Sequence, residues 1–91
     1  MTVLEKKVTI TNKLGLHARA ASKLAQLCSE FDAEVTLELE DNQADASSIM
    51  ALMLLAGGQG KEVTVKTRGS QAQEALQSIC RLITDKFDES E

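Results

Sequence analysis

The stretch NKLGLHARAASKL, residues 12–24, decides the fold, because the spacing of apolar residues changes within it. From Leu4 to Thr11 apolar and polar residues alternate, which is typical of a strand with one face in water. From Ala18 to Glu30 apolar residues recur at the spacing of one helical face. Gly15 permits a turn between these elements, and His17, the only histidine of the chain, stands where the helix begins. The stretch therefore predicts a strand, a glycine turn and a helix that opens on a histidine.

The rest of the chain predicts five more elements of the same two kinds. Alternation of apolar and polar residues returns in three segments, which predict strands at 31–40, 43–46 and 61–69. A short helix is expected from Ser48, which can cap its first turn, to Ala56, after which GGQG stops it. The final helix carries an apolar face from Ala72 to Phe87, and residues 88–91 are expected to fray.

This order of elements, βαββαβα, predicts an α+β fold of the open-faced sandwich type. A four-stranded antiparallel sheet with three helices on one face buries every apolar stripe of the predicted elements at once. The chain has 91 residues, of which 43% are hydrophobic, so it is long enough for one core and too short for two. We therefore expect residues 1–91 to form a single domain.

The composition excludes several classes of partner and ligand. The chain holds 14 acidic and 10 basic residues, no run of Lys or Arg and only two aromatic residues, which argues against nucleic acid. Its longest apolar run, residues 49–56, is too short to cross a bilayer, so we expect a cytoplasmic protein without a membrane partner. Cys28 and Cys80 fall on the apolar faces of predicted helices, where a thiol packs as a small hydrophobic group. One histidine leaves too few strong ligands for a structural zinc site, and we expect neither metal nor cofactor.

His17 is the residue best placed for chemistry. If it caps the first helix, the amides of Ala18 and Arg19 are unpaired donors at the positive end of that helix, where an anion gains roughly 0.3–1 kcal/mol. A neutral imidazole is a nucleophile, and the Arg19 guanidinium suits phosphate oxygens or a partner's carboxylates. Taken alone, a His-x-Arg pair favours a plainer interpretation, a surface histidine and arginine that happen to begin a helix. The chain has no catalytic triad, carboxylate pair or Walker-type glycine loop, which favours a carrier over an enzyme.

Two motifs carry a family resemblance. LGLHARAA (14–21), followed at this spacing by SSIMALMLLAGGQG (47–60), resembles the histidine-containing phosphocarrier HPr family of the phosphoenolpyruvate phosphotransferase system. ITNKLGLHAR (10–19), with FDAEV (31–35) and the terminal FDE (87–89), is most similar to the nitrogen-related branch of that family. The resemblance extends over nearly the whole chain and implies the same α+β fold.

The resemblance also implies a role for each residue of the first motif. His17 would accept a phosphoryl group on Nδ1 from an enzyme I-type kinase charged by phosphoenolpyruvate, and would pass it to a histidine of an enzyme IIA-type protein. Arg19 matches the family's active-site arginine. Ala20 departs from the commonest pattern, which has proline there. Alanine keeps the helix and adds an N–H donor, so we expect activity to survive.

The second motif predicts an exposed apolar surface. Leu52 and Leu55 can face the core, but so short a helix cannot bury its four other large apolar residues. These four residues, which we call the apolar patch, are Ile49, Met50, Met53 and Leu54. In the family the corresponding patch docks partners, and adaptable methionines suit a surface that meets several of them. The competing interpretation is that this helix belongs wholly to the core.

Ser48 has two interpretations. It matches a serine that a dedicated kinase phosphorylates in some relatives, which would make it a regulatory phosphosite. As a helix N-cap it would contribute about 1 kcal/mol, and this interpretation is favoured.

Three other functions stay open at this point. The chain could be a regulatory protein that binds its targets through the apolar patch, or a carrier for sugar uptake in place of the nitrogen-related role. It could also be a small-molecule-binding α+β domain, since such modules share a similar order of elements. For the carrier, we expect a monomer.

Overall fold

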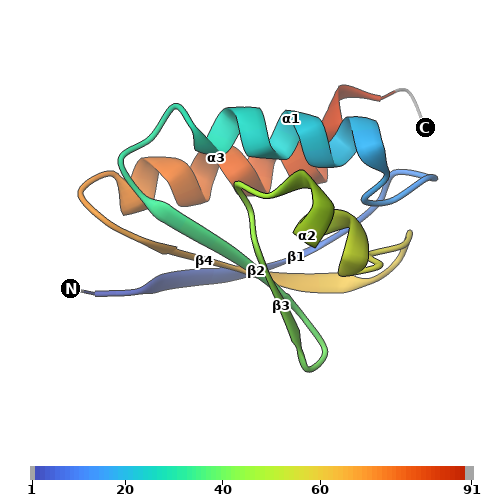
Figure 1. Ribbon diagram of the computed structural model, residues 1–91, viewed down its shortest axis with the longest axis horizontal. Helices are drawn as coiled ribbons and strands as arrows, with labels where there is room; N and C mark the ends of the chain where they lie inside the picture. The colour runs from blue at the N-terminus through green and yellow to red at the C-terminus, as the bar shows by residue number, and fades with distance from the viewer. Residues whose placement is uncertain (1, 90–91) are drawn as a thin grey trace.

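The computed structural model describes residues 2–89 and has the predicted order of elements (Figure 1). The strands are β1 (Leu4–Thr9), β2 (Glu34–Leu39), β3 (Asn42–Asp45) and β4 (Glu62–Arg68). The helices are α1 (Ala18–Cys28), α2 (Ile49–Leu54) and α3 (Ala72–Thr84), and a 3₁₀ turn, η1 (Lys86–Asp88), follows α3. Apart from the end of α3, the bounds differ from the predicted ones by up to three residues, as frayed ends commonly do.

The four strands form one antiparallel sheet in the order β1-β4-β2-β3. Val8 of β1 lies opposite Val63 of β4, and Leu37 of β2 lies between Val65 of β4 and Ala44 of β3. All five of these side chains are buried, so one face of the sheet forms the floor of the core. The predicted α+β sandwich is confirmed, with its helices gathered on one side of the sheet (Figure 1).

The two faces of the sheet differ in chemistry. On the face away from the core, Glu38 pairs with Lys66 at 2.7 Å, and Glu34 pairs with Arg68 across the same two strands. On the other face, α1 contributes the buried side chains of Ala21, Leu24 and Cys28, as its apolar spacing predicted. No helix within residues 2–89 is long and apolar enough to cross a membrane.

The end of α3 corrects the sequence prediction. The helix ends at Thr84 and does not continue to Phe87, although the Phe87 side chain is fully buried. Lys86, Phe87 and Asp88 all have positive φ, of 60°, 56° and 63°, so the chain makes a left-handed turn there. This turn buries Phe87 by folding the chain back over the core, and the apolar spacing alone could not distinguish that arrangement from a longer helix.

The segment expected to fray is also ordered where the structure describes it. Glu89 accepts a hydrogen bond from Asn12, 77 residues earlier in the chain. Lys23 of α1 donates to the Phe87 carbonyl oxygen at 2.8 Å, which holds the turn against α1. Residues 90 and 91, which belonged to the same expectation, lie outside the described residues. We call residues 85–89 the C-terminal strap.

Gly15 joins the loop before α1 to the loop after α2. Its φ is +64°, and the amide of the next residue, Leu16, donates to the Gly57 carbonyl oxygen at 2.8 Å. A Cβ atom at position 15 would lie 2.3 Å from that same oxygen. Only glycine fits both the backbone conformation and the close approach.

We expect Gly15→Ala to lower the free energy of unfolding by more than about 1 kcal/mol, because it adds both a clash and an unfavourable φ. The matched control is Gly58→Ala, since a Cβ atom at Gly58 would meet nothing within 4 Å. That change should move the free energy of unfolding by less than about 0.5 kcal/mol. Urea denaturation of both variants measures the difference, and equal losses would contradict this account of Gly15.

Candidate functional site

His17 occupies the N-cap position of α1, as predicted. Its backbone is extended, with φ −79° and ψ 179°, and its carbonyl oxygen accepts a hydrogen bond from the Ala21 amide at 2.8 Å. Its side chain makes no capping hydrogen bond, so the imidazole is available for other contacts. The amides of Ala18, Arg19 and Ala20 find no acceptor among residues 2–89, and they form the predicted set of unpaired donors.

The imidazole contacts a carboxylate that comes from the other end of the chain. His17 Nε2 lies 2.5 Å from Glu89 Oε2. Asn12 Nδ2 donates to Glu89 Oε1 at 3.1 Å and to the Gly15 carbonyl oxygen at 2.9 Å. The His17 side chain is 25% exposed and that of Glu89 is 14% exposed. One hydrogen-bonded chain therefore links the glycine turn, the asparagine, the C-terminal strap and the histidine.

The charge state of Glu89 follows from these neighbours. Partial burial raises the pKa of its carboxyl group. Hydrogen bonds from Asn12 and His17, the positive charge of His17 when that ring is protonated, and the charge of Arg19 together outweigh this effect. The net result is a pKa below the usual value for glutamate. At neutral pH the His17 ring therefore faces an ionised carboxylate.

The strap that carries Glu89 is strained and anchored. Non-glycine residues at positive φ cost of order 1–3 kcal/mol each, and three of them follow one another here. The buried Phe87 ring and the hydrogen bond from Lys23 to the Phe87 carbonyl oxygen hold this conformation. Strain of this kind persists only where the surroundings enforce it, and here the result is a carboxylate held on His17.

Arg19 is exposed, and its guanidinium makes no hydrogen bond within residues 2–89. Its positive charge contributes to the lowered pKa of Glu89, so it lies within electrostatic reach of the His17–Glu89 pair. The sequence placed Arg19 beside His17. In the structure the Arg19 guanidinium is accessible to an anion from outside the protein.

Sequence reasoning did not find three contributors to this site. Asn12 was placed in the segment of the glycine turn, and Lys23 was given no role. Glu89 was placed in the fraying end and in the FDE motif, with no contact to His17. Glu89 meets His17 across 72 residues of sequence, so no local periodicity could bring the pair together. The signal available was compositional, because an aromatic residue followed by acidic residues closes the chain.

The apolar patch is exposed, as predicted. Fractional exposure runs from 41% for Ile49 to 78% for Leu54, whereas Leu52 and Leu55 are buried. Ser48 caps this helix, since its Oγ accepts a hydrogen bond from the Ala51 amide at 3.2 Å. A further apolar residue, Leu14, is 68% exposed and was missed from the sequence. It directly precedes Gly15, whose backbone touches the loop after α2.

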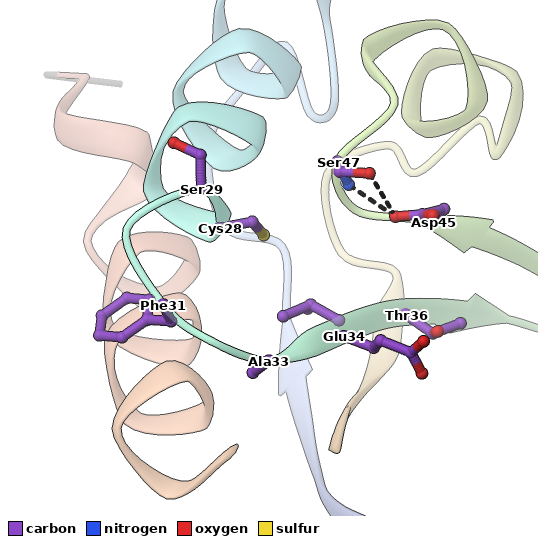
Figure 2. Close-up of a pocket in the computed structure, with 9 residues that line it drawn as sticks. Cys28, Ser29, Phe31, Ala33, Glu34, Thr36, Asp45 and Ser47 are labelled. Atoms are coloured by element: carbon purple, nitrogen blue, oxygen red, sulfur yellow. Dashed lines mark hydrogen bonds between the residues drawn. The ribbon is translucent and has the colours of Figure 1, made fainter. Parts of the chain in front are cut away.

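A hollow of about 470 Å³ lies away from His17, at the C-terminal end of α1 (Figure 2). Burial, followed by the nearby charge of Asp45, raises the pKa of its Cys28 thiol to about 12. Asp45 accepts hydrogen bonds from the Ser47 amide at 2.9 Å and from its hydroxyl at 2.7 Å (Figure 2). In this hollow the Cys28 thiol is therefore protonated and a poor nucleophile, and the Asp45 carboxylate already accepts two hydrogen bonds from Ser47. Cys80 is also buried, as predicted.

Metal ligands are not gathered anywhere in the described chain. Within residues 2–89 no group of three or more His, Cys, Asp or Glu side chains could hold a metal ion.

Comparison with known proteins shows the family of this chain. The family model for the "PTS HPr component phosphorylation site" matches residues 4–85. The chain is 53% identical over 90 residues to "Phosphocarrier protein NPr" of Shewanella violacea, covering 99% of each. It is 46% identical over 89 residues to "Phosphocarrier protein HPr" of Cupriavidus necator, covering 98% of this chain and 100% of that protein. The crystal structure of HPr-C-His from Thermoanaerobacter tengcongensis superposes with a TM-score of 0.91 at 35% identity, covering 97% of this chain and 99% of that one.

The fold and these matches define a phosphocarrier, a protein that receives a phosphoryl group and passes it on, and not an enzyme. The chain belongs to the HPr family of the phosphotransferase system. The resemblance stated from its two motifs is therefore confirmed.

We expect the stability contributed by Glu89 to depend on pH. Its pKa is lower in the folded protein than in the unfolded chain, so its contacts stabilise the fold above the unfolded value and are lost as the pH falls through the folded value. The difference in free energy of unfolding between the parent protein and Glu89→Gln should therefore shrink from about pH 6 to about pH 3. Denaturation across this range measures it. Asp88→Asn serves as the control, and the same dependence in that variant would contradict the assignment to Glu89.

Proposed function

We propose that His17 is the phosphoacceptor, that an enzyme I-type kinase loads it with phosphoenolpyruvate as the ultimate donor, and that an enzyme IIA-type protein unloads it. Members of this family work with partners of these two kinds. The observation that carries the proposal is the placement of the chain's only histidine, partly exposed, at a helix N-terminus with three unpaired amides. No other imidazole competes for the role.

The geometry suits transfer between two proteins. Nδ1 of His17 attacks phosphorus while the bond from phosphorus to the donor atom breaks, so the reaction needs alignment and charge neutralisation more than acid–base chemistry. The amides of Ala18, Arg19 and Ala20 and the Arg19 guanidinium offer donors to the phosphoryl oxygens. Ala20 adds one such amide where proline would have none, which supports retained activity.

The apolar patch supports a docking role. Ile49, Met50, Met53 and Leu54 form an exposed apolar surface on α2, and the contact between Gly15 and the loop after α2 ties this helix to the His17 loop. A partner that buries the patch would thereby be brought to the imidazole. Ser48 begins the same helix, so a phosphate there would place about two negative charges beside the docking surface and weaken loading.

We propose that the carrier is a cytoplasmic monomer. We also propose that it belongs to the nitrogen-related branch. The support is the 53% identity to a protein named NPr over nearly the full length of both chains. The alternative, a sugar-uptake carrier, has the support of a protein named HPr at 46% identity. Competition between the nitrogen-related and the sugar-related enzyme I for the same carrier distinguishes them, and faster loading by the sugar-related enzyme would favour the alternative.

We expect His17→Ala to abolish labelling by radioactive phosphoenolpyruvate in the presence of enzyme I, because no other imidazole is available. The parent protein should be labelled only when enzyme I is added. Circular dichroism should show that the variant keeps its fold, since His17 is partly exposed. Retention of the label by the folded variant would rule out His17 as the acceptor.

We expect Met53→Glu to raise the KM of enzyme I for the carrier by about tenfold or more, equivalent to about 1.4 kcal/mol of binding, because it buries a charge at an apolar contact. The kcat should change little, since Met53 lies outside the phosphoryl site. Gln73→Glu adds the same charge on the exposed face of α3 and is the matched control. Equal KM values for the two variants would exclude the apolar patch from docking.

A further inference from the structure

We propose that Glu89 is a positioning residue for phosphoryl transfer, which keeps the proton of the His17 ring on Nε2 and so leaves Nδ1 as the nucleophile. The inference rests on the proposed function, in which His17 is the phosphoacceptor. It assigns a role to the C-terminal strap, which carries Glu89 to the His17 ring.

The hydrogen bond between His17 and Glu89 has a defined direction. An ionised carboxylate can only accept hydrogen bonds, so the 2.5 Å contact between Glu89 Oε2 and His17 Nε2 requires the proton on the nitrogen. A neutral imidazole carries one ring proton, and its position is set by the hydrogen bond that the ring makes. With Nε2 protonated, Nδ1 keeps its lone pair. Nδ1 makes no hydrogen bond within residues 2–89, so that lone pair is free to attack.

The Glu89 carboxylate is supported by Asn12. Asn12 is fully buried and donates to both Glu89 Oε1 and the Gly15 carbonyl oxygen. Its own Oδ1 is buried without a partner among the described residues, which is costly for a polar side chain. The hydrogen bonds from Asn12 Nδ2 account for burying the side chain at this cost. They hold the Glu89 carboxylate on one side and the glycine turn on the other.

The C-terminal strap is anchored to α1. Phe87 is fully buried, and its carbonyl oxygen accepts a hydrogen bond from Lys23 of α1 at 2.8 Å. His17 begins the same helix, so α1 fixes both the ring and the segment that carries its acceptor. Glu89 therefore cannot shift along the ring without a change in the turn at residues 86–88.

The transfer step balances with this proton in place. The Nδ1 lone pair forms the new N–P bond, the bond from phosphorus to the donor atom breaks, and its electron pair stays with the donor. No proton has to leave the ring, because Nδ1 carries none. The product ring holds a phosphoryl group on Nδ1 and a proton on Nε2 and is positively charged, so the carboxylate of Glu89 stabilises the charge that develops. Unloading to the acceptor follows the same atoms in reverse.

The test separates a charge effect from a proton-position effect. In Glu89→Gln, the amide oxygen takes the hydrogen bond from Asn12 and the amide N–H faces His17 Nε2, which favours the opposite tautomer with the proton on Nδ1. Glu89→Ala removes the acceptor and leaves both tautomers populated. Asp88→Asn is the matched control, since it removes a neighbouring charge that makes no contact with His17.

Nitrogen chemical shifts of the ring, followed to alkaline pH until they no longer change, report the tautomer of the neutral imidazole without any partner enzyme. We expect Nε2–H in the parent protein and in Asp88→Asn, a mixture in Glu89→Ala, and Nδ1–H in Glu89→Gln. The kcat of loading by enzyme I should fall by about tenfold in Glu89→Gln and less in Glu89→Ala, with KM unchanged, since the substitution moves 1.4 kcal/mol or so of transition-state stabilisation.

The inference is overturned if Glu89→Gln keeps the parent tautomer, or if the tautomer changes and the kcat does not. Failure of the proposed function can be distinguished from failure of this inference. If the parent protein were labelled at a residue other than His17, its nitrogen chemical shifts would still show the tautomer that Glu89 sets. Amide spectra of each variant show whether the strap stays folded. A variant with the parent spectrum outside residues 85–89, the parent tautomer and a reduced kcat would also count against the inference.

Discussion

The structure depends on the close approach of two loop backbones, where the amide of Leu16 donates to the Gly57 carbonyl oxygen and Gly15 leaves no Cβ between them. This contact ties the loop before α1 to the loop after α2, which are distant in sequence. It places the imidazole of His17 and the exposed face of α2 on neighbouring segments of one surface. This backbone hydrogen bond therefore constrains the position of His17 relative to α2.

In the proposed function, the site holds a phosphoryl group only briefly. His17 is partly exposed, and the amides that face an incoming anion belong to a helix end and to no closed cavity. Arg19 is exposed and its guanidinium makes no hydrogen bond with the described residues. A deep pocket would hold the phosphoryl group too well to pass it on, since tight binding of a bound state slows its departure. In that function, the open surface would let each partner supply the remaining groups.

The periodicity of apolar residues predicted the order and type of the four strands and three α-helices, because each of them has one wet face and the two periods differ. It did not predict the 3₁₀ turn at Lys86–Asp88. The same reasoning placed His17 at a helix N-terminus and the exposed residues on α2. It extended α3 through Phe87 because a buried residue four positions after Ile83 fits a helical face. It missed Glu89 because a contact across 72 residues depends on how helices pack and leaves no local pattern.

The left-handed turn at residues 86–88 also restricts which sequences the tail can tolerate. β-Branched side chains are the least compatible with positive φ, so valine, isoleucine and threonine are disfavoured at all three positions, whereas glycine and asparagine are compatible. Among variants at residues 86–88, compatibility with a positive φ should therefore limit the tolerated residues more than side-chain chemistry does. Phe87 alone must satisfy both demands, as an aromatic residue with a left-handed backbone and a fully buried ring. In a library of variants of this protein, position 87 should tolerate the fewest substitutions.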